Sequence, residues 1–194
     1  MTRCDLGPVL LRIARSAIGE RLGLSGFDEP GHAALQEHLA TFVTLKQSGQ
    51  LRGCIGSLQA VRPLGVDVRE NAIAAAFRDP RFAPLAAAEF EATSVEVSLL
   101  SADERIEAAS EQDLVERLRP GVDGLILEYR GRRATLLPQV WEALADPREF
   151  LAALKRKAGL PEDFWTPGLS VSRYAVTKWG EPAFGGPDPA LGEA

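Results

Sequence analysis

The segment Leu51–Leu58, with the sequence LRGCIGSL, constrains the fold of this chain more than any other stretch. A short Gly-containing link joins it to the strand-like residues 41–46, so it is expected to be an antiparallel β-strand, yet Gly53 and Gly56 flank Cys54 within it. Glycine inside a strand lowers stability and generally marks a bulge or a place where another backbone or a ligand comes close. The segment therefore predicts a strand whose cysteine is either accessible or tightly packed.

Two interpretations of Cys54 are open at this point. In the first, the thiol is held on a rigid strand, and Arg52, on the same strand face, favours the thiolate if its guanidinium points at the sulfur. In the second, Cys54 is a small buried residue and the glycines serve packing. A Cys/His mechanism would also need a base, and His32 and His38 both precede the first strand expected in the chain.

A second charged motif, Arg78-Asp79-Pro80-Arg81-Phe82, follows an alanine-rich helical stretch. It places one carboxylate between two guanidinium groups, a compact arrangement for holding a loop or an anionic ligand. The alternative is a salt-bridged helix end in which Asp79 before proline is a turn residue.

Hydrophobic periodicity predicts helices and strands joined mainly by hairpins, and hence an α+β fold with an antiparallel or mixed sheet and flanking helices. Helices are expected over residues 6–22, 63–78 and 110–118, with two more starting at Pro138 and Asp146; strands are expected over residues 41–46, 51–58, 95–99, 125–127, 134–137 and 170–179. Residues 1–180 are expected to form a single domain. Residues 181–194, rich in proline and glycine, are expected to be a disordered tail.

Composition narrows the function classes. The 194 residues carry a net charge of −5 without a long Lys/Arg run, so nucleic acid is an unlikely partner. No apolar stretch is long enough to cross a membrane and the first residues lack a secretory signal, which predicts a cytoplasmic protein. The two cysteines, Cys4 and Cys54, do not suggest a disulfide framework.

No sequence motif for a metal or a cofactor stands out. The histidines His32 and His38 are six residues apart, which matches neither a helical zinc pair nor a zinc finger. Nucleotide-phosphate loops and iron–sulfur spacings also have no match, so no metal site and no cofactor are expected from this chain alone.

Two basic islands stand out in the acidic chain. Arg130, Arg132 and Arg133 fall at the tip of a predicted hairpin, and residues 155–157, with the sequence KRK, fall at a predicted helix end. Solvated turns and a helix C-terminus that complements the helix dipole account for both.

Six sequence blocks, taken in order, resemble those of the AMMECR-type domain, which in microbes is called AmmeMemoRadiSam system protein A. The blocks are Phe42–Lys46, Leu51–Gly56, Ala76–Phe82, Gly121–Leu125, Leu136–Trp141 and Leu154–Gly159. The resemblance covers roughly residues 6–180. It implies a larger and a smaller lobe with a cleft near LRGCIG, and an association with a Memo-like protein and a radical-SAM protein.

Two functional hypotheses follow from the residues and the resemblance together. In the first, the chain is a small-molecule or peptide-binding component of a multi-protein system, with Cys54 as a tentative catalytic thiol and Arg52, Gly53, Gly56, Asp79 and Arg81 as binding residues. In the second, it is a non-catalytic adaptor for protein–protein interaction, with a structural Cys54. Whether the chain is an enzyme stays open.

Overall fold

The computed structural model describes residues 6–24 and 31–182. The chain divides into a larger unit, which runs to Leu99 and resumes at Thr177, and a smaller unit, Leu100–Val176. The described residues contain four α-helices and two four-stranded sheets, which confirms the α+β prediction.

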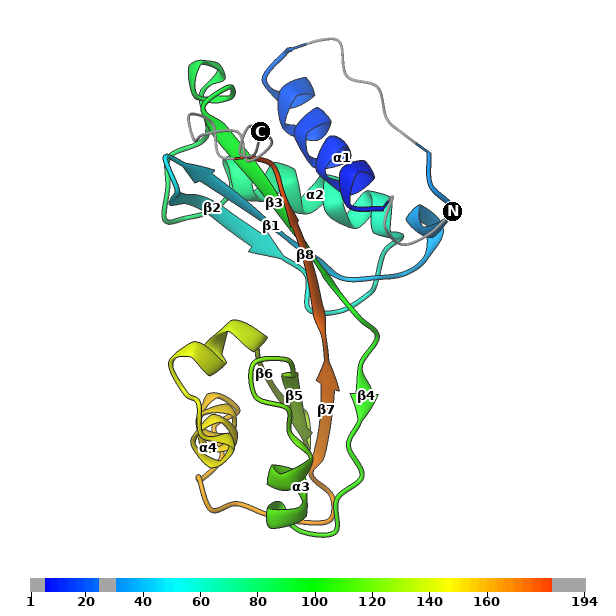
Figure 1. Cartoon of the computed structure of the whole chain (residues 1–194), viewed down its shortest axis with the longest axis vertical. Helices are drawn as coiled ribbons and strands as arrows, with labels where there is room; N and C mark the ends of the chain where they lie inside the picture. The colour runs from blue at the N-terminus through cyan, green and yellow to red at the C-terminus, as the bar shows by residue number, and fades with distance from the viewer. Residues whose placement is uncertain (1–5, 25–30, 183–194) are drawn as a thin grey trace, which may run out of the picture. The chain divides into compact units, whose positions relative to one another are not determined.

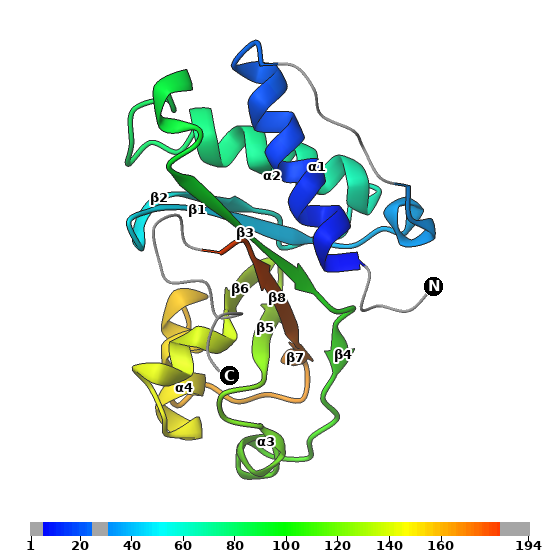
Figure 2. The same cartoon turned by 45° about the horizontal axis from the view of Figure 1, so that its top comes forward.

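The larger unit is a sheet with two helices on one face (Figures 1 and 2). The helices are α1 (Leu6–Arg21) and α2 (Leu64–Phe77), with short 3-10 helices η2 (Ala33–Gln36) and η3 (Ala87–Glu89). The strands are β1 (Thr41–Gln47), β2 (Gln50–Gly56), β3 (Thr93–Leu100) and β8 (Val176–Gly180), in the order β2-β1-β3-β8. Alternate strand residues such as Val43, Leu45 and Val97 are fully buried in the core that includes both helices.

Both glycines of the LRGCIG segment lie where a side chain would collide. A Cβ atom at Gly53 would be 2.2 Å from the carbonyl oxygen of Ala75 on α2, and one at Gly56 would be 2.2 Å from the Phe42 ring. The prediction of a close approach at these glycines is therefore confirmed, and at Gly53 the approaching group is the backbone of α2.

The smaller unit is a second antiparallel sheet with helices of its own. Its elements are β4 (Glu104–Arg105), α3 (Glu111–Arg117), β5 (Gly124–Tyr129), β6 (Arg132–Leu136), the 3-10 helix η4 (Pro138–Glu142), α4 (Pro147–Lys157) and β7 (Ser170–Tyr174), and the strand order is β4-β7-β5-β6. Helix α4 contacts β5 and β6. Its Phe150 stacks on Trp141 with ring centroids 3.8 Å apart, within a core of leucine side chains.

The prediction of one strand over residues 170–179 is wrong. The chain breaks at Ala175 into β7 and β8, which belong to different sheets. Ser101 fixes the break, because its amide donates to the Ala175 carbonyl and its Oγ accepts from the Ala175 amide. Alternation along a strand does not reveal a change of partner strand.

The segment expected to be a disordered tail begins at a residue that makes defined contacts. Glu181 accepts two hydrogen bonds of 2.6 Å from Arg15 on α1, and its amide donates to the Val95 carbonyl. Residues 183–194 of that segment, like Cys4, lie outside the described residues.

Lys155 is buried, which corrects its interpretation as part of a solvated helix end. Its side chain is 0% exposed, and its Nζ lies 2.8 Å from Glu111 Oε1 and 2.8 Å from the Glu162 carbonyl oxygen. Lys155 follows Leu151 by four residues and so shares the core-facing side of α4. The buried ammonium is retained because both acceptors replace lost water.

We expect Gly53→Ala to lower the free energy of unfolding by about 2–3 kcal/mol, because the added methyl group would force β2 away from α2. Urea unfolding followed by circular dichroism measures the loss. Gly31→Ala is the matched control, since nothing lies within 4 Å of a Cβ at Gly31. Equal stability of the two variants would show that α2 yields without cost.

We expect Lys155→Ala to destabilise the protein by about 2–3 kcal/mol, because the substitution opens a cavity and removes the partner of Glu111. The neighbouring Arg156→Ala serves as the control. Its side chain is 55% exposed, so its ion pair with Glu162 contributes at most about 1 kcal/mol. A thermal melt in which both variants match the wild type would contradict the buried position of Lys155.

Candidate functional site

Cys54 lies on the face of the larger sheet that points away from the helices. Neighbouring Gly53 faces α2, and successive strand residues point to opposite faces. The thiol is half-buried and free. Its cross-strand neighbour Thr44 donates a hydrogen bond of 3.3 Å from Oγ1 to the Cys54 Sγ. The thiol is thus held by a hydroxyl group on a rigid pair of strands.

Asp79 and Arg81 bind the backbone of Cys54 from the side. Asp79 Oδ2 accepts from the Cys54 amide at 2.9 Å, and Arg81 Nη2 donates to the Cys54 carbonyl at 3.2 Å. Because β2 is an edge strand, these two side chains take the place of a neighbouring strand at this residue. The RDPRF motif shows features of both interpretations: Asp79 accepts from the Arg81 amide and pairs with its guanidinium, as in a salt-bridged turn, and it also holds β2. Arg78 pairs with Glu70, so only one of the two arginines of the motif contacts Asp79.

The pKa of the Asp79 carboxylate lies well below its ordinary range, so the group stays ionised. Hydrogen bonds from the Arg81 side chain lower its pKa most, burial acts in the opposite direction, and the Cys54 and Arg81 amides lower it further. The side chain of Asp79 is only 2% exposed, whereas that of Arg81 is 53% exposed. The pair is therefore a buried anion covered by a partly exposed cation.

Arg52 does not point at the Cys54 sulfur, so the condition for a thiolate-stabilising role is not met. Its Nε and Nη2 donate to Glu89 at 3.0 and 3.1 Å, and its guanidinium lies 5.9 Å from the centre of the Phe82 ring. Arg52 lowers the pKa of Glu89 to about 2, with further help from the Ala86 amide. The pair ties η3 to β2.

A row of polar side chains continues across the same sheet face. Thr44 has Cys54 as its neighbour on β2 and Glu96 as its neighbour on β3. Glu96 forms ion pairs with Lys46 and with Lys178, the latter at 2.7 Å. Burial opposes ionisation of Glu96, but the two lysines hold its pKa below the ordinary value. We call these five residues, Thr44, Lys46, Cys54, Glu96 and Lys178, the polar sheet face.

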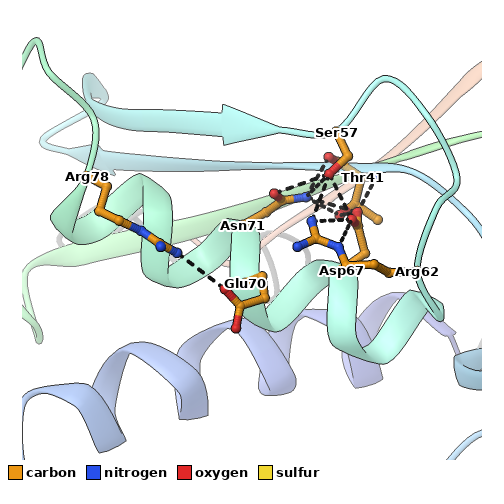
Figure 3. Close-up of polar contacts among 7 residues, drawn as sticks. All are labelled: Thr41, Ser57, Arg62, Asp67, Glu70, Asn71 and Arg78. Carbon is orange, nitrogen blue, oxygen red and sulfur yellow. Dashed lines mark hydrogen bonds and ion pairs between the residues drawn. The ribbon is translucent and has the colours of Figure 1, made fainter.

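A buried polar cluster beside the LRGCIG segment was missed by the sequence analysis (Figure 3). Asp67, in the first turn of α2, accepts hydrogen bonds of 2.7–2.9 Å from Thr41, Ser57, Arg62 and Asn71. The cluster fastens the loop after Gly56 to β1 and α2. Its one sequence signal is that Asp67 and Asn71, four positions apart, fall on the same side of α2 as apolar residues such as Val68. Because the cluster is satisfied internally, it is structural.

Histidine and metal-binding side chains do not gather at Cys54 within the described residues. The His32 ring accepts from the Ala34 amide and caps η2, and His38 bridges to Pro63. Over residues 6–24 and 31–182, no group of three His, Cys, Asp or Glu side chains is placed to hold a metal ion. In the same residues, no helix combines the length and apolar character needed to cross a membrane.

The AMMECR1 family profile matches residues 11–179. The chain belongs to the AMMECR1 family. A protein of Methanothermobacter thermautotrophicus is 42% identical over 179 residues, covering 88% of this chain and 91% of the relative, and one of Thermofilum pendens is 38% identical over 187 residues, covering 87% and 86%. The crystal structure of the uncharacterized protein PH0010 from Pyrococcus horikoshii is similar with a TM-score of 0.75 and 36% identity, covering 92% and 93%.

The structure of this AMMECR1 family member brings three of the six sequence-predicted site residues, Cys54, Asp79 and Arg81, into one hydrogen-bond network. Gly53 fixes the strand that carries Cys54. Gly56 accommodates Phe42 instead. Sequence reasoning did not identify Thr44 as the partner of Cys54 or Glu89 as the partner of Arg52. These pairs are 10 and 37 residues apart along the chain, respectively.

We expect the protein to become less stable in acid because protonation of Glu89 removes its ion pair with Arg52. The folded-state pKa of Glu89 is about 2, below its ordinary value of 4.5, so its stabilisation is present above pH 4.5 and is lost as the pH falls towards 2. Urea unfolding at pH 5 and pH 3 should therefore show a smaller decrease for Glu89→Gln than for the wild type. Glu91→Gln, at an exposed residue, should keep the wild-type decrease; parallel decreases in all three proteins would contradict the assignment.

Proposed function

We propose that this protein is the binding component of a multi-protein system. It holds a small-molecule or peptide ligand at the polar sheet face around LRGCIG and acts with a Memo-like protein and a radical-SAM protein. The observation that carries the proposal is the polar sheet face itself, where a thiol, a hydroxyl and a Lys–Glu–Lys row share one side of a rigid sheet.

The chemistry of this face suits a polar ligand. Binding groups on strands hold their positions better than groups on loops. Thr44 offers a hydroxyl, Cys54 offers a thiol, and Lys178, 56% exposed, has ammonium donors beyond the one that faces Glu96. Two lysines and one glutamate leave this face a net charge of only +1, which favours a neutral, zwitterionic or weakly anionic ligand over a strongly charged one.

The support for the two partners comes from the resemblance of six sequence blocks to the AmmeMemoRadiSam system protein. Memo-like proteins are related to non-haem iron dioxygenases, and radical-SAM proteins carry radical chemistry. In this division of roles the partners supply the redox chemistry and this chain supplies recognition. Cys54 then contacts the ligand without acting as an isolated nucleophile.

A second candidate, a non-catalytic adaptor with a structural Cys54, is favoured by a different observation. The conspicuous groups of the two motifs are occupied within the protein: Gly53 by α2, Arg52 by Glu89, and Asp79 by Arg81 and the Cys54 amide. Residues engaged in this way stabilise a strand without requiring a ligand. The two candidates differ in whether the polar sheet face affects product formation by the multi-protein system after the complex has formed.

We expect Thr44→Val to leave complex formation intact but to lower the output of the assembled system at least tenfold. The substitution replaces the hydroxyl on the ligand face by a methyl group and leaves the side-chain volume nearly unchanged. Complex formation is measured by gel filtration with the Memo-like and radical-SAM proteins of the same genome, and output by product formation in the mixture. Thr177→Val, at an exposed position of β8, is the control. Unchanged output with Thr44→Val would favour the adaptor, and no complex with either partner would contradict both candidates.

A further inference from the structure

The tip of the β5–β6 hairpin holds an arginine in a backbone conformation that suits other residues better. Arg130 has φ +45° and Gly131 has φ +80°, so both central residues are left-handed, as in a type I′ turn. Asn-Gly is the favoured pair for this turn, and a long side chain with positive φ is uncommon. Violations of local preference concentrate at functional sites.

An open surface pocket lies beside this turn and is rich in arginine. Its volume is about 360 Å³, and it is lined by Glu128, Tyr129, Arg130, Gly131, Arg132, Arg133 and Gly168. Three arginines against one glutamate leave a local charge of +2 in a chain whose net charge is −5. The lining therefore attracts anions although the protein as a whole repels them.

The guanidinium groups retain donors for a ligand. Arg133 pairs with Glu128 at 3.1 Å, and Arg132 donates from Nη1 to the Gly159 carbonyl. Arg130 lies 5.3 Å from the centre of the Tyr129 ring and has no carboxylate partner among the described residues. All five N–H donors of Arg130, together with Nε and Nη2 of Arg132, are thus left for a bound group.

We propose that this open pocket binds a phosphate group, either as free inorganic phosphate or as part of a small phosphate ester. A phosphate carries up to two negative charges, which matches the local surplus of +2, and its oxygens suit the paired donors of guanidinium groups. A single carboxylate would neutralise only half of the surplus. This site is in the smaller unit and is independent of the proposed function of the polar sheet face.

Titration of the full-length, ¹⁵N-labelled protein with inorganic phosphate at constant ionic strength tests the site. Saturable shifts of the Gly131 and Gly168 amide signals are expected with phosphate, at least tenfold weaker binding with acetate, and none with chloride. Phosphoserine binding more tightly than phosphate would identify an ester as the ligand class, whereas equal or weaker binding would identify the free ion. Shifts that chloride reproduces would overturn the proposal.

Arg130→Asn is the decisive variant, because it removes the guanidinium while supplying the residue that the turn prefers. The melting temperature should stay the same or rise, and phosphate affinity should fall at least tenfold. Arg105→Asn, at a 58% exposed arginine on β4, should bind as the wild type does. Wild-type affinity in Arg130→Asn would refute the site, and a lower melting temperature would show that Arg130 serves stability instead.

Discussion

The contact between Gly53 and the carbonyl of Ala75 determines how the larger unit is built. At this point a strand and a helix meet backbone to backbone, which requires glycine on β2 and small residues on the facing side of α2. The contact fixes the face of β2 that points to the core, so Cys54 must point to the other side. It also brings the end of α2 beside the strand edge, where Asp79 reaches the Cys54 amide.

Two carboxylate–guanidinium pairs then complete the edge of β2. Asp79–Arg81 binds the backbone of Cys54, and Glu89–Arg52 joins the segment before β3 to the start of the same strand. Both carboxylates stay ionised in the folded protein because their partners lower the pKa. Because these charged groups are paired with each other, the groups left for chemistry here are the Cys54 thiol on β2 and the hydroxyl of its cross-strand neighbour Thr44 on β1.

Features that depend on near neighbours could be predicted from the sequence, and those that depend on distant partners could not. The strand over Thr41–Gln47, its hairpin with β2 and the Ser110 cap of α3 follow from alternation, turn residues and capping chemistry. The break at Ala175, the burial of Lys155 and the Asp67 cluster each depend on a residue elsewhere in the chain. At the site, Gly53 and Asp79 carried recognisable signals, but a sequence does not show which carboxylate an arginine will meet.

The two groups of arginines illustrate what pairing does to function. Arg52 and Arg81 each face a carboxylate, so they present little net charge and serve mainly to hold β2. Arg130 and Arg132 lack such carboxylates among the described residues, so their charge is available to an external group. A strongly anionic ligand therefore has more to gain at the β5–β6 hairpin than at LRGCIG. The motif strand, with its balanced charges and its thiol, is better suited to a ligand recognised by hydrogen bonds and shape.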